Sequence, residues 1–539
     1  MTSRRNYCLL ILVLASMLFP IPFTRVITFS PFQVPDVFES FSWYLWPSLH
    51  LLSASLVLIY KGCVNIDRSS KNSFLPVFAT IYIWLLFYVI PAFVNYPLLW
   101  KSTEEQVLFA KSLMYGTVSR NQGWPASYIL LIMLHQLLDF DILFTAPLLA
   151  AVLNFLVPLT IFLLSRKFAP KYAFLAPLLF ALPQTYYYRF FSDYLYGFSL
   201  FLILVYLMYW SDRWAKALIF IFFTSLTVGH PITSLVYIIL FSLYVFSEFI
   251  KFRDKGLFGT LTLIILIFAS WYLYNELAFQ AISPYIVYIS KMERLAYIQS
   301  PQVYFRTPFH ESLPYIFLYT FRYLLFALLG ITSLLGLLVM IRRREARKTL
   351  ILLSLILSSL LPWLIIKASS PESFDNRFMV FGTLPVALAS TYAIATKLRR
   401  ITYVVLMLLP ISFALAFFPS TFMLFAHEFE FRGGEFVAYH SLDNTTIITD
   451  EYSANFIALY NLYTQPLGYI SDVTIFNKDP VAVYIPASPN TVLRSLRQDI
   501  QAFISHRRDP TSFLALDQRL SESHNVVYDS RYITVWSKT

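Results

Sequence analysis

The sequence is poor in charge, in cysteine and in enzyme signatures. Only 13% of its 539 residues are charged, and its two cysteines, Cys8 and Cys63, lie at the ends of apolar segments, so no disulfide framework is expected. It has no HExxH or CxxC metal motif, no internal repeat and no low-complexity tract. Because 58% of the residues are hydrophobic, the chain carries more apolar surface than a soluble core buries. These features exclude a soluble enzyme and indicate a polytopic membrane protein.

Positive charge is present, but it is concentrated in short clusters between apolar segments. Loops rich in Lys and Arg stay on the cytoplasmic side of a membrane. An N-terminus in the cytoplasm places every cluster on that side, facing anionic membrane lipids, so the net charge of +11 does not indicate a nucleic-acid partner. The clusters are Arg4–Arg5, Lys61–Lys71, Arg166–Lys171, Arg213–Lys216, Lys251–Lys255, Arg342–Lys348 and Lys397–Arg400.

The apolar segments predict about 13 transmembrane helices, each close to the ~17–25 residues that cross a bilayer. They lie near 7–25, 44–60, 75–95, 142–165, 172–190, 194–210, 215–229, 231–250, 258–280, 317–341, 349–367, 377–396 and 401–420. An odd number of crossings puts the C-terminus outside. The prediction is therefore a mainly α, multi-pass protein of the cell membrane with a cytoplasmic N-terminus and a small C-terminal extracytoplasmic α/β domain.

Three regions follow from this pattern. Residues 1–74 hold two N-terminal transmembrane helices, 75–420 form a transmembrane core with an external loop at 96–141, and 421–539 form the extracytoplasmic domain. In the last region, strands are expected at Thr445–Thr449, at Val481–Ile485 and around a turn after Asn525. Residues 125–138 are too short to cross, so we expect a helix lying along the outer surface.

The external loop carries an acidic pair, Glu104 and Glu105, at the start of an amphipathic helix. One interpretation is a helix cap, with Ser102 or Thr103 at the N-cap and a Glu in the first turn. The other is a catalytic base, because a half-buried carboxylate at the mouth of a bundle has a raised pKa. We place Glu105 ahead of Glu104, since it shares a helix face with Leu108 and Phe109 that is expected to pack on the bundle.

The loop and its surroundings resemble the first external loop of GT-C glycosyltransferases, with an archaeal-like arrangement. The likeness rests on a crossing followed by the acidic pair, on a helix with Ala110 and Gly116, on Trp124-Pro125-x-x-Tyr128, and on the segments Asp141–Phe168 and Leu175–Pro183. It implies a membrane enzyme that takes a sugar from a polyprenyl-phosphate donor, with its catalytic acid in this loop and an external α/β domain at its end. The chain has Glu where Asp is commoner, and it lacks the Trp-Trp-Asp run of oligosaccharyltransferase subunits.

Other polar residues lie at the predicted outer ends of the helices. Arg322, Arg377, Arg306 and His230 are candidates for binding the donor phosphate, because arginine's planar fork suits phosphate and an arginine inside a membrane needs an anionic partner. For His230, the alternative is a turn residue between Gly229 and Pro231. Further candidates are Arg189, Asp193, His310, Glu372, Asp375, Asp139 and Asp141.

The carboxylates Asp139 and Asp141 form the sole Asp-x-Asp. They could hold a divalent ion, but we favour the interpretation as a polar stop and helix cap at the membrane border. Arginines make a metal unnecessary, so no cofactor and no metal is expected. The expected partners are the polyprenyl-phosphate sugar donor, membrane lipids, and an acceptor that is a glycan, a lipid or a protein.

The best-supported function is transfer of a sugar from a polyprenyl-phosphate donor at the outer face of the membrane. A transporter for lipid or glycan is one alternative, but it predicts related halves and polar residues at mid-bilayer. A non-catalytic membrane scaffold subunit is the other alternative. It does not explain why acidic and basic residues gather at the outer end of the helix bundle.

The topology predicts how single cysteines will react when Cys8 and Cys63 are replaced by Ser. A cysteine at Ser127 should be labelled by an impermeant maleimide added to intact cells, and a cysteine at Lys171 should be labelled only after the membrane is opened. External labelling at position 171 would contradict the assignment.

Overall fold

The structure is a computed structural model, and it describes the bundle of helices in most detail. The described residues are 50, 54, 57, 101–114, 125–181, 193–210, 212–253, 256–276, 278–279, 313–369, 375–398, 400–408, 447–449, 482–485, 525–529 and 534–537. The predicted crossings at 7–25, 44–60 and 75–95 lie almost wholly outside these residues.

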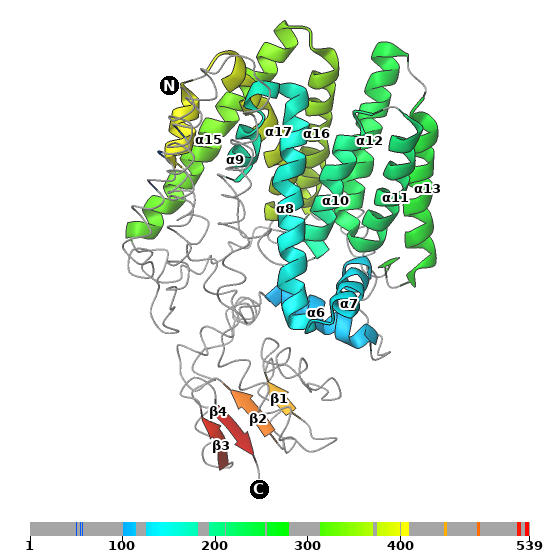
Figure 1. The fold of residues 1–539 in the computed structure, drawn as a ribbon, viewed down its shortest axis with the longest axis vertical. Coiled ribbons are helices and arrows are strands. Elements are labelled where there is room, and N and C mark those ends of the chain that lie inside the picture. The colour runs from blue at the N-terminus through cyan, green and yellow to red at the C-terminus, as the bar shows by residue number, and fades with distance from the viewer. Residues whose placement is uncertain are drawn as a thin grey trace, which may run out of the picture.

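Long helices run roughly alongside one another through the bundle (Figure 1). They are α8 (Ile142–Phe168), α10 (Asp193–Leu207), α11 (Arg213–Gly229), α12 (Pro231–Phe252), α13 (Phe258–Tyr274), α15 (Leu313–Arg342), α16 (Ala346–Ser369) and α17 (Asp375–Thr396). Shorter elements accompany them: α6 (Lys101–Met114), α7 (Ala126–Leu138), the 3₁₀ turn η3 (Pro170–Tyr172) and α9 (Leu175–Ala181).

Three of the described helices are long and apolar enough to cross a membrane: Ile142–Phe168, Pro231–Lys251 and Leu324–Arg342. Shorter apolar helices occupy Asp193–Leu207, Phe258–Tyr274 and Val380–Thr396. Most helix bounds agree with the predicted apolar segments. Within the predicted segment 172–190 the structure describes the fully buried helix α9, and 182–192 lie outside the described residues, so this crossing stays a prediction.

The centre of the bundle is aromatic. Phe381 of α17 contacts Phe198 and Phe201 of α10, with ring centroids 5.8 and 5.0 Å apart. Phe180 of α9 stacks on Phe198 at 5.7 Å, and Tyr237 of α12 meets Phe201 edge to face at 6.3 Å. Such ring pairs add to the free energy gained from burial. The cluster therefore joins four helices that are distant in sequence.

Helices α15 and α17 approach each other most closely at Gly336. A Cβ built on Gly336 would lie 2.0 Å from the carbonyl oxygen of Ala389, so only glycine fits this contact. Nearby, the hydroxyls of Thr332 and Ser390 are 2.9 Å apart, and Ser390 also donates to the carbonyl of Leu329. Small residues at helix interfaces allow this kind of close backbone approach within membranes.

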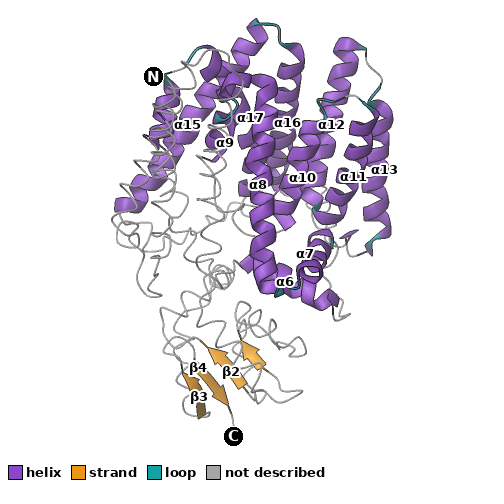
Figure 2. Ribbon diagram, in the orientation of Figure 1, coloured by secondary structure: helices purple, strands orange, loops and turns teal. Residues whose placement is uncertain are grey.

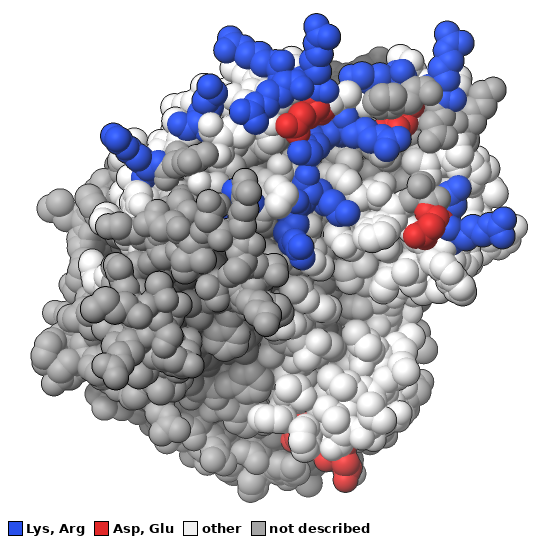
Figure 3. Space-filling view, turned by 45° about the horizontal axis from the view of Figure 1, so that its top comes forward, with Lys and Arg blue, Asp and Glu red and all other residues white. Residues whose placement is uncertain are grey.

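The basic side chains gather at one end of the bundle, where α15 ends and α16 begins (Figure 3). Helices α6 and α7 lie at the opposite end (Figure 1). We call the first the basic end and the second the α6–α7 end. The described side chains at the basic end include those of Arg166, Lys167, Lys171, Arg213, Arg253, Arg343, Arg344, Arg347, Lys348 and Arg400. This separation is what the predicted topology requires, and the orientation in the membrane stays a prediction.

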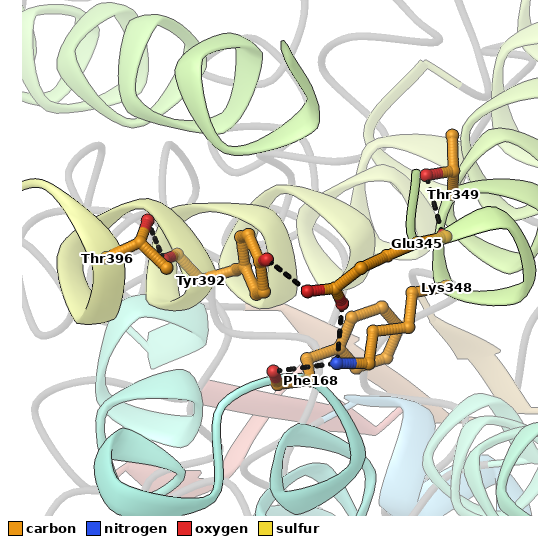
Figure 4. Close-up of polar contacts among 6 residues, drawn as sticks. All are labelled: Phe168, Glu345, Lys348, Thr349, Tyr392 and Thr396. Carbon is orange, nitrogen blue, oxygen red and sulfur yellow. Dashed lines mark hydrogen bonds and ion pairs between the residues drawn. The ribbon is translucent and has the colours of Figure 1, made fainter. Parts of the chain in front are cut away.

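A polar network closes the basic end (Figure 4). Lys348 contacts the Glu345 carboxylate at 2.6 Å and donates to the Phe168 carbonyl at 3.4 Å, while the Tyr392 hydroxyl donates to the other carboxylate oxygen. Burial acts to raise the pKa of Glu345, but the hydrogen bonds from Lys348 and Tyr392 outweigh it and hold this pKa below its usual value. The carboxylate therefore stays charged and connects α8, α16 and α17.

Four short strands form a sheet beyond the α6–α7 end (Figure 2). They are β1 (Ile447–Thr449), β2 (Ala482–Ile485), β3 (Asn525–Asp529) and β4 (Thr534–Ser537), in the spatial order β1-β2-β4-β3. β1 and β2 are parallel, the other pairs are antiparallel, and the register shifts between Val526 and Tyr528. The strands lie where the sequence predicts them. The helices expected between them lie outside the described residues, so the α/β domain stays a prediction.

The close crossing predicts opposite effects at two glycines of α15. Gly336→Ala should lower the stability by about 1–3 kcal/mol, because the new methyl group overlaps the backbone of α17. Gly330→Ala is the matched control: nothing lies within 4 Å of its Cβ position, so the better helix propensity should raise stability by up to about 1 kcal/mol. Thermal unfolding of the purified protein in detergent measures both. Equal melting temperatures would contradict the crossing.

Candidate active site at the α6–α7 end

Helix α6 is fixed on α7 by a buried polar contact. The hydroxyl of Ser127 donates to the side-chain oxygen of Gln106 over 3.1 Å, and both residues are almost fully buried. Three residues further along α6, the ring of Phe109 packs on Tyr128 at 5.3 Å. A buried hydrogen bond with both partners satisfied holds a helix in one register. The first turns of α6 are thereby positioned relative to the bundle.

The glutamates lie at the beginning of α6. This helix begins at Lys101, so Ser102 and Thr103 are within its first turn and do not occupy its N-cap. The expected packing face is also shifted: Val107 and Ala110 are fully buried, whereas Leu108 and Phe109 are only half-buried. Position 104 precedes Val107 by three residues, while position 105 precedes Leu108 and Phe109. The face of position 104 packs on the protein through Val107, and the face of position 105 does so through Phe109. The ranking of Glu105 ahead of Glu104 therefore stays a prediction.

Helix α7 exposes an apolar stripe. Ser127, Tyr128 and Leu131 are buried against the protein, while Met133 and Leu137 are 61% and 80% exposed. A helix that lies in the membrane interface places such a face among the lipid chains. This supports the expectation that residues 125–138 lie along the membrane surface. Because Ser127 is buried, a cysteine at position 127 is inaccessible in the folded protein, and the external labelling test belongs at the exposed Gln136.

Asp139 and Asp141 act as helix caps. Asp139 ends α7 in the left-handed conformation (φ 53°), and a carboxylate oxygen of Asp141 accepts a hydrogen bond from the backbone N–H of Leu143 at 2.8 Å, at the start of α8. Across the described residues, no three His, Cys, Asp or Glu side chains form a group suited to a metal ion.

Lys111 is a residue that the sequence reasoning missed. Burial lowers the pKa of Lys111, and the charge of the nearby Asp141 carboxylate partly offsets this effect. The charge of Lys111 on α6 thus lies near that of Asp141 at the start of α8. The sequence signal was a lysine one helical turn after the apolar Val107 on the same helix face. Asp141, the carboxylate near it, lies thirty residues away in the sequence and could not be identified from the pattern.

His230 caps the N-terminus of α12. Its Nδ1 accepts from the backbone N–H of Thr233 at 3.2 Å and lies 2.8 Å from the Thr233 hydroxyl. The ring also packs edge to face on Tyr194 at 5.3 Å, and a Cβ at Gly197 would lie 2.7 Å from the Cβ of His230. These contacts agree with the turn interpretation, and they engage Nδ1 of the ring. Phosphate binding by His230 stays a prediction.

Arg322 and Arg377 lie on the pair of helices that cross at Gly336. Arg322 precedes Gly336 by fourteen residues and Arg377 precedes Ala389 by twelve, so they stand about 21 and 18 Å from the crossing along their helices. Both lie in the helix halves that point away from the basic end. Asp375 begins α17. The side chains of these residues are not described.

The remaining candidates divide into two groups. Asp193 is the first residue of α10, and its carboxylate accepts from the backbone N–H of Tyr194 at 2.9 Å. Arg189, Arg306, His310 and Glu372 lie outside the described residues. Their roles stay predictions.

The Gln106–Ser127 contact predicts a pair-dependent loss of stability. Ser127→Ala leaves the buried Gln106 oxygen without a donor and should cost about 1–3 kcal/mol. The double variant Gln106→Met with Ser127→Ala removes both polar groups and should recover most of this loss. Melting temperatures in detergent compare the two, and a double variant less stable than Ser127→Ala alone would contradict the contact.

The chain matches no known family profile and no curated protein. It is similar to solved structures. The apo oligosaccharyltransferase of Archaeoglobus fulgidus aligns at a TM-score of 0.53 and 10% identity, over 79% of this chain and 71% of that one. ArnT from Cupriavidus metallidurans, solved with undecaprenyl phosphate, aligns at 0.52 and 12% identity, over 88% and 99%. Its apo form also aligns at 0.52 and 12%, over 87% and 99%. The resemblance predicted from the sequence is confirmed at the level of the fold, because the chain shares the architecture of these solved structures.

Proposed function

We propose that this protein transfers a sugar from a polyprenyl-phosphate donor to an acceptor at the outer face of the cell membrane. The observation that carries the proposal is the agreement in fold with ArnT, a protein solved with undecaprenyl phosphate, over almost the whole of both chains. An acidic pair on a helix packed across the end of the bundle, opposite the basic loops, adds chemical support.

The Glu104–Glu105 pair supplies the general base. One carboxylate removes the proton from an acceptor hydroxyl, whose oxygen then attacks the anomeric carbon of the sugar. The bond from this carbon to the phosphate oxygen breaks, and polyprenyl phosphate leaves with the bonding electrons. Position 105 lies on the face of α6 that packs on the protein through Phe109, and burial favours a carboxylate that accepts a proton near neutral pH. We therefore assign the base to Glu105, with Glu104 beside it.

Arg322 and Arg377 neutralise the leaving phosphate. They stand at similar distances from the crossing on two adjacent helices, in the halves nearer the α6–α7 end. A planar guanidinium donates two parallel hydrogen bonds to phosphate oxygens, and it keeps its charge at every working pH. An arginine inside an apolar helix also requires an anionic partner, which the donor provides.

Matched variants of the purified protein test the assignment. With a panel of polyprenyl-phosphate-linked sugars and a membrane lipid extract as acceptor, Glu105→Gln should lower the rate of polyprenyl phosphate release by about 100-fold or more. Glu104→Gln keeps the base and should lose much less activity. The opposite ranking would exchange the two roles, and full activity in the double variant would remove the pair from the chemistry.

Binding of undecaprenyl phosphate provides a second readout for the same variants. Arg322→Glu and Arg377→Glu should weaken it, whereas Glu105→Gln should not. If the wild-type protein neither binds undecaprenyl phosphate nor releases polyprenyl phosphate from any donor of the panel, the protein is a scaffold and not a transferase.

A further inference from the structure

A groove lies between α11 and α13, on the side of the bundle away from α15. It has a volume of about 590 Å³, within the range of small-molecule sites, and its lining is almost entirely apolar. The groove is open because the facing positions are small: Thr224 and Thr227 on α11 and Ser270 on α13. In Figure 1, α13 and α15 stand at opposite edges of the bundle, so the groove is remote from the helix that carries Arg322.

One end of the groove is braced by an unusual hydrogen bond. The carbonyl of Thr227 would normally accept from the N–H four residues on, but that residue is Pro231, which has none. The hydroxyl of Tyr272, a buried residue of α13, donates to this carbonyl instead, at 3.5 Å. The two helices are therefore tied together at the α6–α7 end while the groove beside them stays open.

The lining changes character along the groove. Leu263, Leu266 and Ile267 line the part of the groove nearer the basic end. Ser270, Tyr274 and Asn275 line the part nearer the α6–α7 end. No lining residue is charged. From Leu263 to Asn275 the helix rises about 18 Å, close to the ~15 Å depth of the hydrocarbon in one membrane leaflet. The groove thus has the length and the polarity gradient of a single lipid leaflet.

Trp271, at the polar part of the groove, has an unsatisfied donor. Its indole N–H is buried and has no hydrogen-bond partner in the described part of the chain. A buried donor without a partner is unfavourable. Because Trp271 lines the groove, an oxygen atom of an occupant is a candidate acceptor for this N–H, and tryptophan side chains are common at the depth of the lipid interface.

We propose that this groove binds one hydrocarbon chain of a membrane glycerolipid from the leaflet on the α6–α7 side, with the glycerol-level oxygens beside Ser270, Trp271 and Asn275. The absence of charge in the lining suits this part of a lipid better than a phosphate group. The polar part of the groove adjoins α7, because the Cβ of Ala126 lies 3.4 Å from the Cβ position at Gly229, the residue after Val228 in the lining. A bound lipid therefore also lies close to α7 and stabilises its position. This role does not depend on the proposed reaction.

Photolabelling of the full-length protein in vesicles tests the site. The probe is a phosphatidylcholine with a diazirine in the middle of one acyl chain, and labelled residues are mapped by mass spectrometry. Leu263, Leu266 and Ile267 line the groove, whereas Ile265 and Leu273 do not, although Leu263 and Leu266 are about as exposed as Ile265. The lining residues should be labelled about tenfold more, because a chain held in the groove that buries about two more CH₂ groups than a chain on the open surface is favoured by roughly that factor.

Two variants separate a specific site from general lipid contact. Thr224→Phe with Ser270→Phe fills the groove and should abolish the preference, whereas Leu273→Phe, on an exposed face of α13, should preserve it. Equal labelling of lining and non-lining residues in the wild type would overturn the proposal, whatever the stability of the filled variant. Preferential labelling by a diazirine-bearing polyprenyl phosphate, displacing the phosphatidylcholine, would also overturn it by assigning the groove to the donor.

Discussion

The arrangement of the bundle depends on the close contact of α15 and α17 at Gly336. With a backbone carbonyl 2.0 Å from where a side chain would begin, the two helices meet almost backbone to backbone. Helix α17 packs also on α16, α9 and α8, and its Phe381 lies in the aromatic centre of the bundle. Lipid chains are as apolar as leucine, so tight packing of this kind is a main source of helix association within a membrane.

Most polar side chains inside the bundle form their hydrogen bonds with the backbone of their own helix. Ser199, Thr227 and Thr391 each donate to the carbonyl four residues earlier in their own helix. Such contacts are local and carry no information about a ligand. Asp141 and His230 belong to the same class, because each caps the helix that follows it. A polar residue in an apolar sequence is therefore a sound candidate only after its local partners have been considered.

Much of the fold could be predicted from sequence, since each helix of the bundle corresponds to an apolar run bounded by a basic cluster or a turn. The GT-C resemblance followed from the order of these runs and of the external loop. The buried face of α6 could not be predicted, because it is set by Gln106 meeting Ser127, twenty-one residues away. For the crossing predicted at 172–190, the described part forms the buried helix α9, and the rest of the crossing stays a prediction.

The network at the basic end and the crossing at Gly336 together hold the C-terminal part of α15 in place. The N-terminal part of the helix, which carries Arg322, can tilt about the crossing. The C-terminal end of α15 adjoins the turn at Glu345, which Lys348 and Tyr392 hold to the bundle, and Gly336 lies only two turns away. Arg322 lies about 21 Å beyond this pivot, so a tilt of roughly 5° displaces it by about 2 Å. A rotation too small to disturb the packing at the crossing thus changes the separation of Arg322 and Arg377 by a distance comparable to the radius of a phosphate group.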